Sequence, residues 1–598
     1  MKKRSLSIIF FIIVILFYFV RVYNLDQDLP PWGIGYYQPV DEGAYSLLAL
    51  NYIHFGSINP AYDNVGHAIS TPLQCRTNII GNIVSIFFMN FLGNNYYGFR
   101  MGYIFWGLLV LAIYILCIKS ICKNYTDGIR KNIVITISVV AILFDFMFYM
   151  ASRTVENSIV RLTFNLLIVY VCFKLENSYR LRFFLISFFA IISVFLIYIT
   201  NIFVCLAVFL YILNVLLVNK DKNQKTDLII YSILGMVVAI IVSELYYKIF
   251  WQSSLIDSTL SIINSFSSST GYTITGNTET GGVLKAIMYK VLAFSGANSL
   301  LYNLPVLFLS VAFFPYILLK YVKKGNRVSI LFYIIISFLA QTLFIEDCIG
   351  RKIIVIYPCF ILLILDVIVN REHFESFLTR LNIFGKLIYA YYILFDILLC
   401  GFVLIYRFKF AQDNTNLDFD TSIKVCIIIF GFNMACICFV SIFSCLCKGT
   451  SKYLNVYNAF LISMFCAILF NGSLIYKFSL KEPTFYDRDA MIELNDYIGK
   501  KDIYVTGGGF QLGFALYNDM QYIMQSDMEG IKNCMESDDN VYIIDYEQIG
   551  DWTTEFFNEY YFDQGEYTLE PVYIIHRNYQ AYGIKRNFCL YKKIKYER

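Results

Sequence analysis

Residues 2–22, KKRSLSIIFFIIVILFYFVRV, place three basic residues before an apolar run. The run is long enough to cross the hydrocarbon core of a bilayer as one helix. No small-residue cleavage site follows Val22, so we interpret the segment as an uncleaved membrane span rather than a signal peptide. Its basic start is expected to stay in the cytoplasm, because basic residues resist transfer across the membrane.

The rest of the chain repeats this apolar pattern. Of its 598 residues, 58% are hydrophobic and only 15% are charged, which excludes a single water-soluble globule. The apolar runs predict thirteen spans in a polytopic α-helical membrane protein. These lie near Leu6–Val22, Phe99–Ile118, Ile133–Tyr149, Val155–Phe173, Phe183–Ile199, Phe203–Val218, Leu228–Trp251, Leu300–Leu319, Val328–Ile345, Ile353–Ile368, Leu387–Ile405, Val425–Leu446 and Leu454–Tyr476.

Lys and Arg collect in every second connection between these spans, which predicts the orientation. With the N-terminus in the cytoplasm, all the basic connections fall inside, and thirteen crossings place residues 481–598 outside. We therefore expect an integral membrane protein, and the lack of retention or glycosylation signals favours a bacterial plasma membrane. The basic residues are Lys119, Lys123, Arg130 and Lys131; Lys174, Arg180 and Arg182; Lys220, Lys222 and Lys225; Lys320, Lys323, Lys324 and Arg327; Arg371, Arg380 and Lys386; Lys448 and Lys452.

The first outer connection carries its own helical pattern. In YYQPVDEGAYSLLALNYIHFG (residues 36–56), apolar residues recur at helical spacing after Asp41 and Glu42, and Gly56 stops the run. A second apolar stretch, Asn78–Leu92, follows Pro72. Two helices lying in the membrane interface fit this pattern better than an irregular loop.

Three parts are expected along the chain. Residues 1–370 form a catalytic membrane module, residues 371–480 add further transmembrane helices, and residues 481–598 form a small extracytoplasmic α/β domain. In this last part strand patterns (DIYVT, MQYIM, VYIID) alternate with helix patterns such as DRDAMIELNDYIGK, an order that packs naturally as an α/β layer.

Ionisable residues gather at the predicted outer ends of the spans, where charges are costly unless they are paired, hydrated or used. Their convergence on one face predicts a site, although each group has a simpler interpretation. In these simpler interpretations, Asp41 is a helix N-cap, Arg153 and Glu156 (SRTVENS) form a structural ion pair, and Arg351 with Lys352 contacts lipid phosphates. The groups are Asp41 and Glu42; Arg100; Arg153 and Glu156; Glu346, Asp347, Arg351 and Lys352.

Together these motifs resemble a family. The D-E-x-x-Y arrangement of Asp41, Glu42 and Tyr45, the turn with Arg153 and Glu156, and the segment from Arg351 to Pro358 look like the GT-C superfamily of polyprenyl-phosphate-sugar-dependent glycosyltransferases. The protein O-mannosyltransferase and aminoarabinose transferase branch is the most similar. The resemblance covers roughly residues 1–368 and rests on short motifs.

The resemblance implies an inverting transfer of sugar from a polyprenyl phosphate to a hydroxyl of a lipid, glycan or protein acceptor. It implies that Asp41 is the general base, that Glu42 orients the acceptor and that Glu156 is a second carboxylate nearby. Tyr45 belongs to the same motif. The implied phosphate-binding groups are Arg100, Arg153, Arg351 and Lys352.

One departure concerns the first loop. Relatives of the aminoarabinose type often carry a basic residue before a Pro-Pro-Leu element, whereas this sequence reads AISTPLQCR, with Ser70 at that place. Either Arg76 or His67 takes over the donor phosphate, or the donor is held differently.

Other functions remain open. A secondary transporter is disfavoured, because transporters place charged and helix-breaking residues near the membrane midplane. A catalytically silent GT-C-like scaffold is a further alternative. The basic residues follow the membrane topology, and acidic residues outnumber them after residue 481, so we expect no nucleic-acid partner. The sequence contains no dense acidic cluster of the kind that holds a divalent ion, so it implies no cofactor. A divalent metal would still be compatible with the chemistry.

Overall fold

The structure is a computed structural model of the whole chain, and it describes most of the membrane helices and the strands of the C-terminal part. The described residues are 3–27, 49, 52–53, 56, 79–93, 95–125, 127–155, 157–251, 254–257, 259–260, 304–321, 328–344, 354–394, 396, 456–481, 483, 485, 488–489, 503–506, 521–524, 540–546, 567–581 and 584–595.

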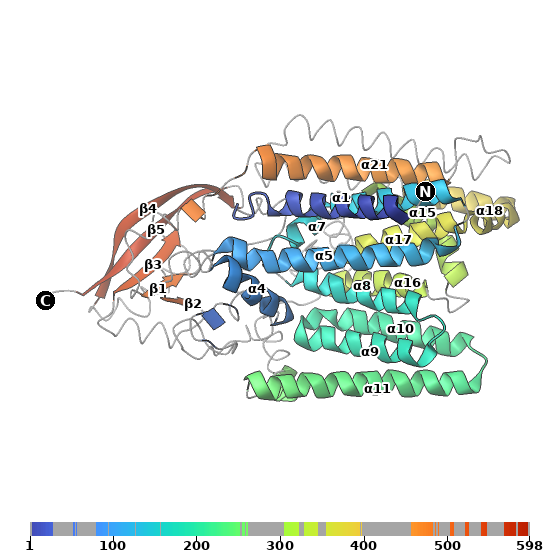
Figure 1. The fold of residues 1–598 in the computed structure, drawn as a ribbon, viewed down its shortest axis with the longest axis horizontal. Coiled ribbons are helices and arrows are strands. Elements are labelled where there is room, and N and C mark those ends of the chain that lie inside the picture. The colour runs from blue at the N-terminus through green and yellow to red at the C-terminus, as the bar shows by residue number, and fades with distance from the viewer. Residues whose placement is uncertain are drawn as a thin grey trace, which may run out of the picture.

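The helices run roughly side by side in a bundle, and a twisted sheet lies beyond one end of it (Figure 1). We call this the sheet end and the other the opposite end. The first half contains α1 Lys3–Val22, α4 Ile79–Leu92, α5 Tyr96–Ile121, η2 Cys122–Asn124, α6 Gly128–Leu143, α7 Phe146–Ala151, α8 Ser158–Lys174, α9 Tyr179–Leu196 and η3 Ile199–Asn201. The second half contains α10 Ile202–Val218, α11 Lys222–Tyr246, the π-helical η4 Tyr247–Trp251, α15 Leu304–Tyr321, α16 Ser329–Phe344, α17 Ile356–Val369, α18 Arg371–Arg380, α21 Val456–Ile475 and the π-helical η6 Tyr476–Lys481.

Four of the described helical stretches are long and apolar enough to cross a membrane. They are Tyr96–Ile121, Tyr179–Leu196, Lys222–Ile249 and Tyr457–Lys481, and several shorter apolar helices accompany them. Together with α1, these helices match most of the predicted spans within a few residues. The predicted spans Leu387–Ile405 and Val425–Leu446 lie partly and wholly outside the described residues.

One predicted span is not a single continuous helix. Residues 133–149 were expected to form a single helix, but α6 ends at Leu143 and α7 begins at Phe146. The reason is Asp145, whose Oδ1 accepts a hydrogen bond of 2.6 Å from the amide of Phe148 and so caps a new helix. Asn471 of α21 accepts a hydrogen bond of 3.0 Å from the amide of Phe146, so a neighbouring helix satisfies a backbone amide at the break.

Helix α4 forms in the second apolar stretch of the first loop, where a helix was predicted, and it packs closely along α5. The contact depends on Gly102, because a Cβ atom at this position would lie 2.5 Å from Ser85 Oγ and 2.7 Å from the Ser85 backbone. Ser85 Oγ donates a 3.0 Å hydrogen bond to the Phe99 carbonyl. Small residues permit such a close approach between helices in a membrane.

The C-terminal strands form a five-stranded mixed sheet in the order β2-β1-β3-β5-β4. Strands β1 Ile503–Thr506, β2 Gln521–Met524 and β3 Val541–Tyr546 coincide with the three predicted strands, and β1 pairs parallel to both others. The long strands β4 Tyr567–Ala581 and β5 Ile584–Lys595 were not predicted; they pair antiparallel, and β5 also pairs antiparallel to β3. Of the helix predicted at DRDAMIELNDYIGK, only Arg488 and Asp489 are among the described residues, and both are helical.

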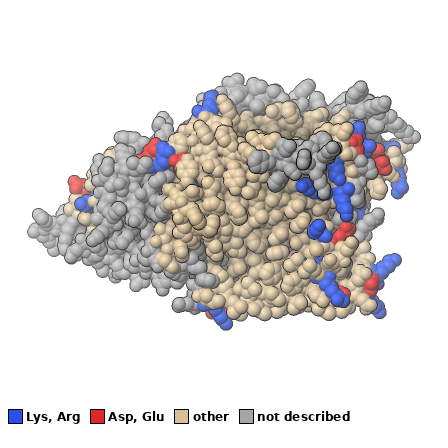
Figure 2. All heavy atoms as spheres, viewed as in Figure 1, with Lys and Arg blue, Asp and Glu red and all other residues tan. Residues whose placement is uncertain are grey.

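The surface separates apolar and charged residues along the bundle. Figure 2 shows Lys, Arg, Asp and Glu gathered toward the ends, with an almost uncharged belt between them. Helix α11 exposes many large apolar side chains, among them Ile233 at 55% and Ile241 at 52%. A belt of this kind is expected of a protein whose sides face lipid.

Candidate active site

The site begins at the turn that follows α1, residues 23–27. Asn24 has a φ of 49°, in the left-handed region that Asn tolerates better than most residues, and this ends the helix. The Leu25 and Gln27 amides bond back to the carbonyls of Val22 and Asn24, at 3.2 and 3.1 Å. Because the turn leads into the loop that carries Asp41, its position controls where that loop starts.

Arg100, near the start of α5, contacts this turn from one side. Its Nη1 donates to the carbonyls of Leu25 at 2.7 Å and Gln27 at 2.9 Å, and its guanidinium lies 4.6 Å from the ring centre of Tyr96. The side chain is buried. Charged donors to backbone carbonyls form strong hydrogen bonds, so Arg100 fixes the path of the chain as it leaves the membrane helix.

Arg153 holds the same turn from the other side. It lies in the short connection between α7 and α8, and it donates through Nη2 to the Asn24 carbonyl and through Nη1 to the Tyr149 hydroxyl. Burial lowers the pKa of Arg153, and the nearby guanidinium groups of Arg100 and Arg21 lower it further. An anion near this group is therefore electrostatically favoured.

Arg21, near the end of α1, completes the group of basic residues. It is fully buried, and it donates through Nε to Ser152 Oγ at 2.8 Å and through Nη2 to the Leu143 carbonyl at 2.9 Å. Its guanidinium lies 4.2 Å from the ring centre of Phe17. Arg21 thereby joins α1 to the break between α6 and α7, where Leu143 is the last residue of α6.

The segment after α21 attaches to the same turn. Arg488 Nη1 donates to Asp26 Oδ2 at 2.8 Å, and Asn24 Nδ2 donates to the Ser479 carbonyl at 3.1 Å. Asp26 is 9% exposed and Arg488 is 30% exposed. Burial lowers the pKa of Arg488, but its hydrogen bonds to Asp26 and Asp489 more than offset this, so the pKa lies above its ordinary value.

Among the described residues of this arrangement, positive charge exceeds negative charge. Arg21, Arg100 and Arg153 are all at most 4% exposed, and the described acids whose charges act on them are Asp145, on Arg21, and Asp26, on Arg153. Guanidinium groups stay charged when buried, and they bind phosphate and carboxylate oxygens well. The site can thus order a loop and bind an anion at the same end of the bundle.

Of the site residues predicted from sequence, Arg100 and Arg153 lie in this cluster, within reach of one turn. The others lie outside the described residues, so their places in the site stay predictions: Asp41, Glu42, Tyr45, Arg76, Glu156, Arg351 and Lys352. Sequence reasoning missed Arg21, Asp26 and Arg488. A signal existed only for Arg21, which is a charged residue inside the first apolar run. Within the described part of the chain, no three His, Cys, Asp or Glu side chains gather as metal ligands.

No family model matches the chain, and no curated protein sequence matches it. Solved structures do match in fold. The crystal structure of ArnT from Cupriavidus metallidurans in the apo state has a TM-score of 0.56 and 9% identity, covering 98% of this chain and 98% of that chain. The structure of ArnT bound to undecaprenyl phosphate has a TM-score of 0.53 and 10% identity, covering 99% and 98%. At this identity the likeness shows a shared fold, over nearly the whole length of both chains.

Proposed function

We propose that the protein is a membrane glycosyltransferase that moves a sugar from a polyprenyl phosphate to an acceptor hydroxyl, at the outer membrane face and with inversion. The observation that carries the proposal is the agreement in fold over 98% of the chain with ArnT, a protein also seen bound to undecaprenyl phosphate. The motifs around Asp41, Arg153 and Arg351 point to the same superfamily independently of that fold.

The proposed reaction needs a base and an anion site. Asp41 accepts the proton of the acceptor hydroxyl, whose oxygen forms a bond to the anomeric carbon. The bond from that carbon to the phosphate oxygen breaks, and its electron pair leaves with the polyprenyl phosphate. Arg351 and Lys352 are the proposed partners of the departing phosphate, and Glu42 and Glu156 orient the acceptor.

The described arginines support this scheme in two ways. Arg100 and Arg153 bind the carbonyls of the turn after α1, so they fix the start of the loop that carries Asp41. Together with Arg21 they also form a group of buried positive charges in the described part of the sheet end, which favours an anionic ligand there. We propose that Arg100 and Arg153 position the loop and add to the field at the phosphate.

The test uses the purified full-length protein and a panel of polyprenyl-phosphate sugars, and measures loss of the sugar from its carrier. The wild type should release sugar from at least one donor. The Asp41→Asn variant should be slower by a factor of 100 or more, since general bases contribute roughly 10²–10⁴ to such rates. Asp63→Asn is the matched control, because it removes an acid from the same loop and should retain activity.

Three results would contradict the proposal or part of it. A wild type that is inactive across all donors would favour the transporter or the silent scaffold. If the wild type is active and the Asp41→Asn variant is equally active, the protein is a transferase but Asp41 is not its general base. Loss of activity in both Asp41→Asn and Asp63→Asn would indicate a loop that tolerates no change, and would also remove the specific role of Asp41.

A further inference from the structure

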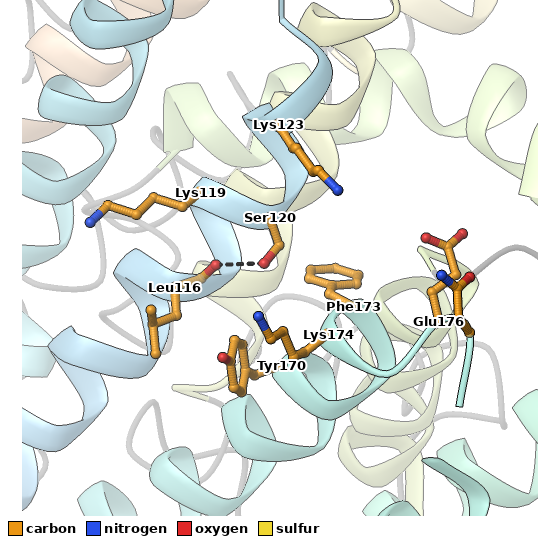
Figure 3. A pocket seen from close by; sticks show the side chains of 9 residues that line it. Leu116, Lys119, Ser120, Lys123, Tyr170, Phe173, Lys174 and Glu176 are labelled. Carbon is orange, nitrogen blue, oxygen red and sulfur yellow. Dashed lines mark hydrogen bonds between the residues drawn. The ribbon is translucent and has the colours of Figure 1, made fainter. Parts of the chain in front are cut away.

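A cavity of about 360 Å³ opens at the opposite end of the bundle, away from the buried arginines. It lies where α5 and η2 pass the end of α8, and these helices pack against each other. The lining residues are Leu116, Lys119, Ser120, Lys123, Tyr170, Phe173, Lys174, Glu176 and Asn177 (Figure 3).

Helical spacing explains why these residues meet. On α5 and η2, Leu116, Lys119, Ser120 and Lys123 are separated by three and four positions, so they share one face. On α8, the rings of Tyr170 and Phe173 share a face with Lys174 for the same reason. Lysines that only set the membrane orientation need no common cavity, whereas these three line a single one.

The cavity carries a net positive charge. Lys119, Lys123 and Lys174 contribute three ammonium groups against the single carboxylate of Glu176. In the part of the chain that the structure describes, none of the three lysines forms an ion pair, and their side chains are exposed. In Figure 3, Lys123 and Lys174 extend toward the space around Ser120 and Phe173, and Lys119 extends away from it.

An apolar stripe leads from this cavity along the bundle. Leu116 lines the cavity and is 41% exposed, and Leu109 and Phe105 lie on the same face of α5 with 36% and 42% exposed. Residues 105–116 of α5 carry no charged side chain, so this surface can contact acyl chains. A free phosphate ion has no apolar part that could contact such a stripe. A phospholipid would contact both, with its acyl chain on the stripe and its phosphate in the cationic cavity.

We propose that the cavity binds the phosphate headgroup of an anionic phospholipid, with an acyl chain along Leu116, Leu109 and Phe105. Lys123 and Lys174 donate hydrogen bonds to the phosphate oxygens, because an ammonium group is a three-way donor with a full charge. Cationic pockets between transmembrane helices bind anionic headgroups in this way. The inference does not depend on the proposed transferase reaction, which belongs to the sheet end.

Native mass spectrometry of the full-length protein, titrated with phosphatidylglycerol in detergent, tests the proposal. The double variant Lys123→Gln/Lys174→Gln should weaken binding of the tightest lipid about 30-fold, from roughly fivefold per lysine. Lys220→Gln/Lys222→Gln is the matched control, because it removes two exposed lysines at the same end, just before and at the start of α11, outside the cavity. It should change the affinity less than twofold.

Two further arms identify the ligand. Phosphatidylcholine should bind at least tenfold more weakly than phosphatidylglycerol, and inorganic phosphate should not displace the bound lipid. Lys123→Arg/Lys174→Arg should restore binding, which separates loss of charge from loss of fold. Equal binding of both lipids, an unchanged affinity in the Gln variant, or displacement by inorganic phosphate would each overturn the proposal.

Discussion

The ion pair between Arg488 and Asp26 should be a measurable link between the C-terminal part and the turn after α1. The Arg488→Gln variant removes a charged hydrogen bond of 2.8 Å and leaves a carboxylate that is only 9% exposed. Exposed pairs contribute at most about 1 kcal/mol and breaking a buried pair costs about 3–5 kcal/mol. The intermediate burial here predicts a loss of about 2 kcal/mol.

The assay is unfolding of the full-length protein in mixed micelles of mild detergent and SDS, with the free energy taken at a common composition. The matched control is Arg180→Gln. Arg180 also pairs with an acid, Asp227 at 3.0 Å, but the two side chains are 64% and 32% exposed. Water and salt screen such a pair, so this variant should unfold like the wild type.

A double-mutant cycle isolates the pair itself. Asp26→Asn and Arg488→Gln are measured singly and together, and the coupling free energy should be at least about 1 kcal/mol. A coupling below about 0.3 kcal/mol would refute the reasoning, because the link would then contribute nothing to stability. A loss in Arg180→Gln equal to that in Arg488→Gln would refute it too, since burial would not be the deciding difference.

Three further predictions concern other parts of the molecule. Arg153→Lys should lower the sugar transfer rate about 10- to 100-fold, because an ammonium group cannot replace the planar guanidinium at both of its acceptors; a wild-type rate in the transfer assay would contradict this. Gly102→Ala should destabilise the protein by about 1–3 kcal/mol in micelle unfolding, since its Cβ would meet Ser85, whereas Gly128→Ala should not destabilise because nothing lies within 4 Å there. Burial raises the pKa of the Cys122 thiol to about 11, so maleimide at pH 8 should spare it in the folded protein and label it after denaturation, as peptide mass spectrometry would show.

The helical part could be predicted largely because hydrophobic length is a local property. The second apolar stretch, Asn78–Leu92, corresponds to α4 almost residue for residue. The break at Asp145 was missed because its apolar flanks outweighed one acid in a search for bilayer-length runs. The signal was nevertheless present, since an Asp before an apolar run is a typical N-cap.

The hairpin of β4 and β5 was missed for a different reason. Pro571 lies within β4, and Pro normally argues against a strand interior. Here the pairing with β5 shifts register between Pro571 and Tyr573, and such an irregularity accommodates a residue that cannot donate to the ladder. In β5 the basic residues Lys592, Lys593 and Lys595 obscure the apolar alternation.

The links that organise the candidate site are beyond local sequence reasoning. Asp26 and Arg488 are 462 positions apart, and Arg21 meets Ser152 across 131 positions. No periodicity connects such residues, so only the fold brings them together. Arg100 and Arg153 were predicted as site residues from their place at helix ends, but their contacts with the turn after α1 could not be predicted.

The buried arginine cluster and the open cavity use different cations, and the chemistry of these cations explains why. At the sheet end, Arg21, Arg100 and Arg153 are buried, and each donates to a backbone carbonyl. At the opposite end, Lys123 and Lys174 are exposed and line an open cavity. A guanidinium can be buried while charged because it shares its charge among several donors, whereas a compact ammonium group keeps its water. Positive charge that must hold a loop within the protein therefore comes from Arg, and positive charge that meets a fluid leaflet can come from Lys.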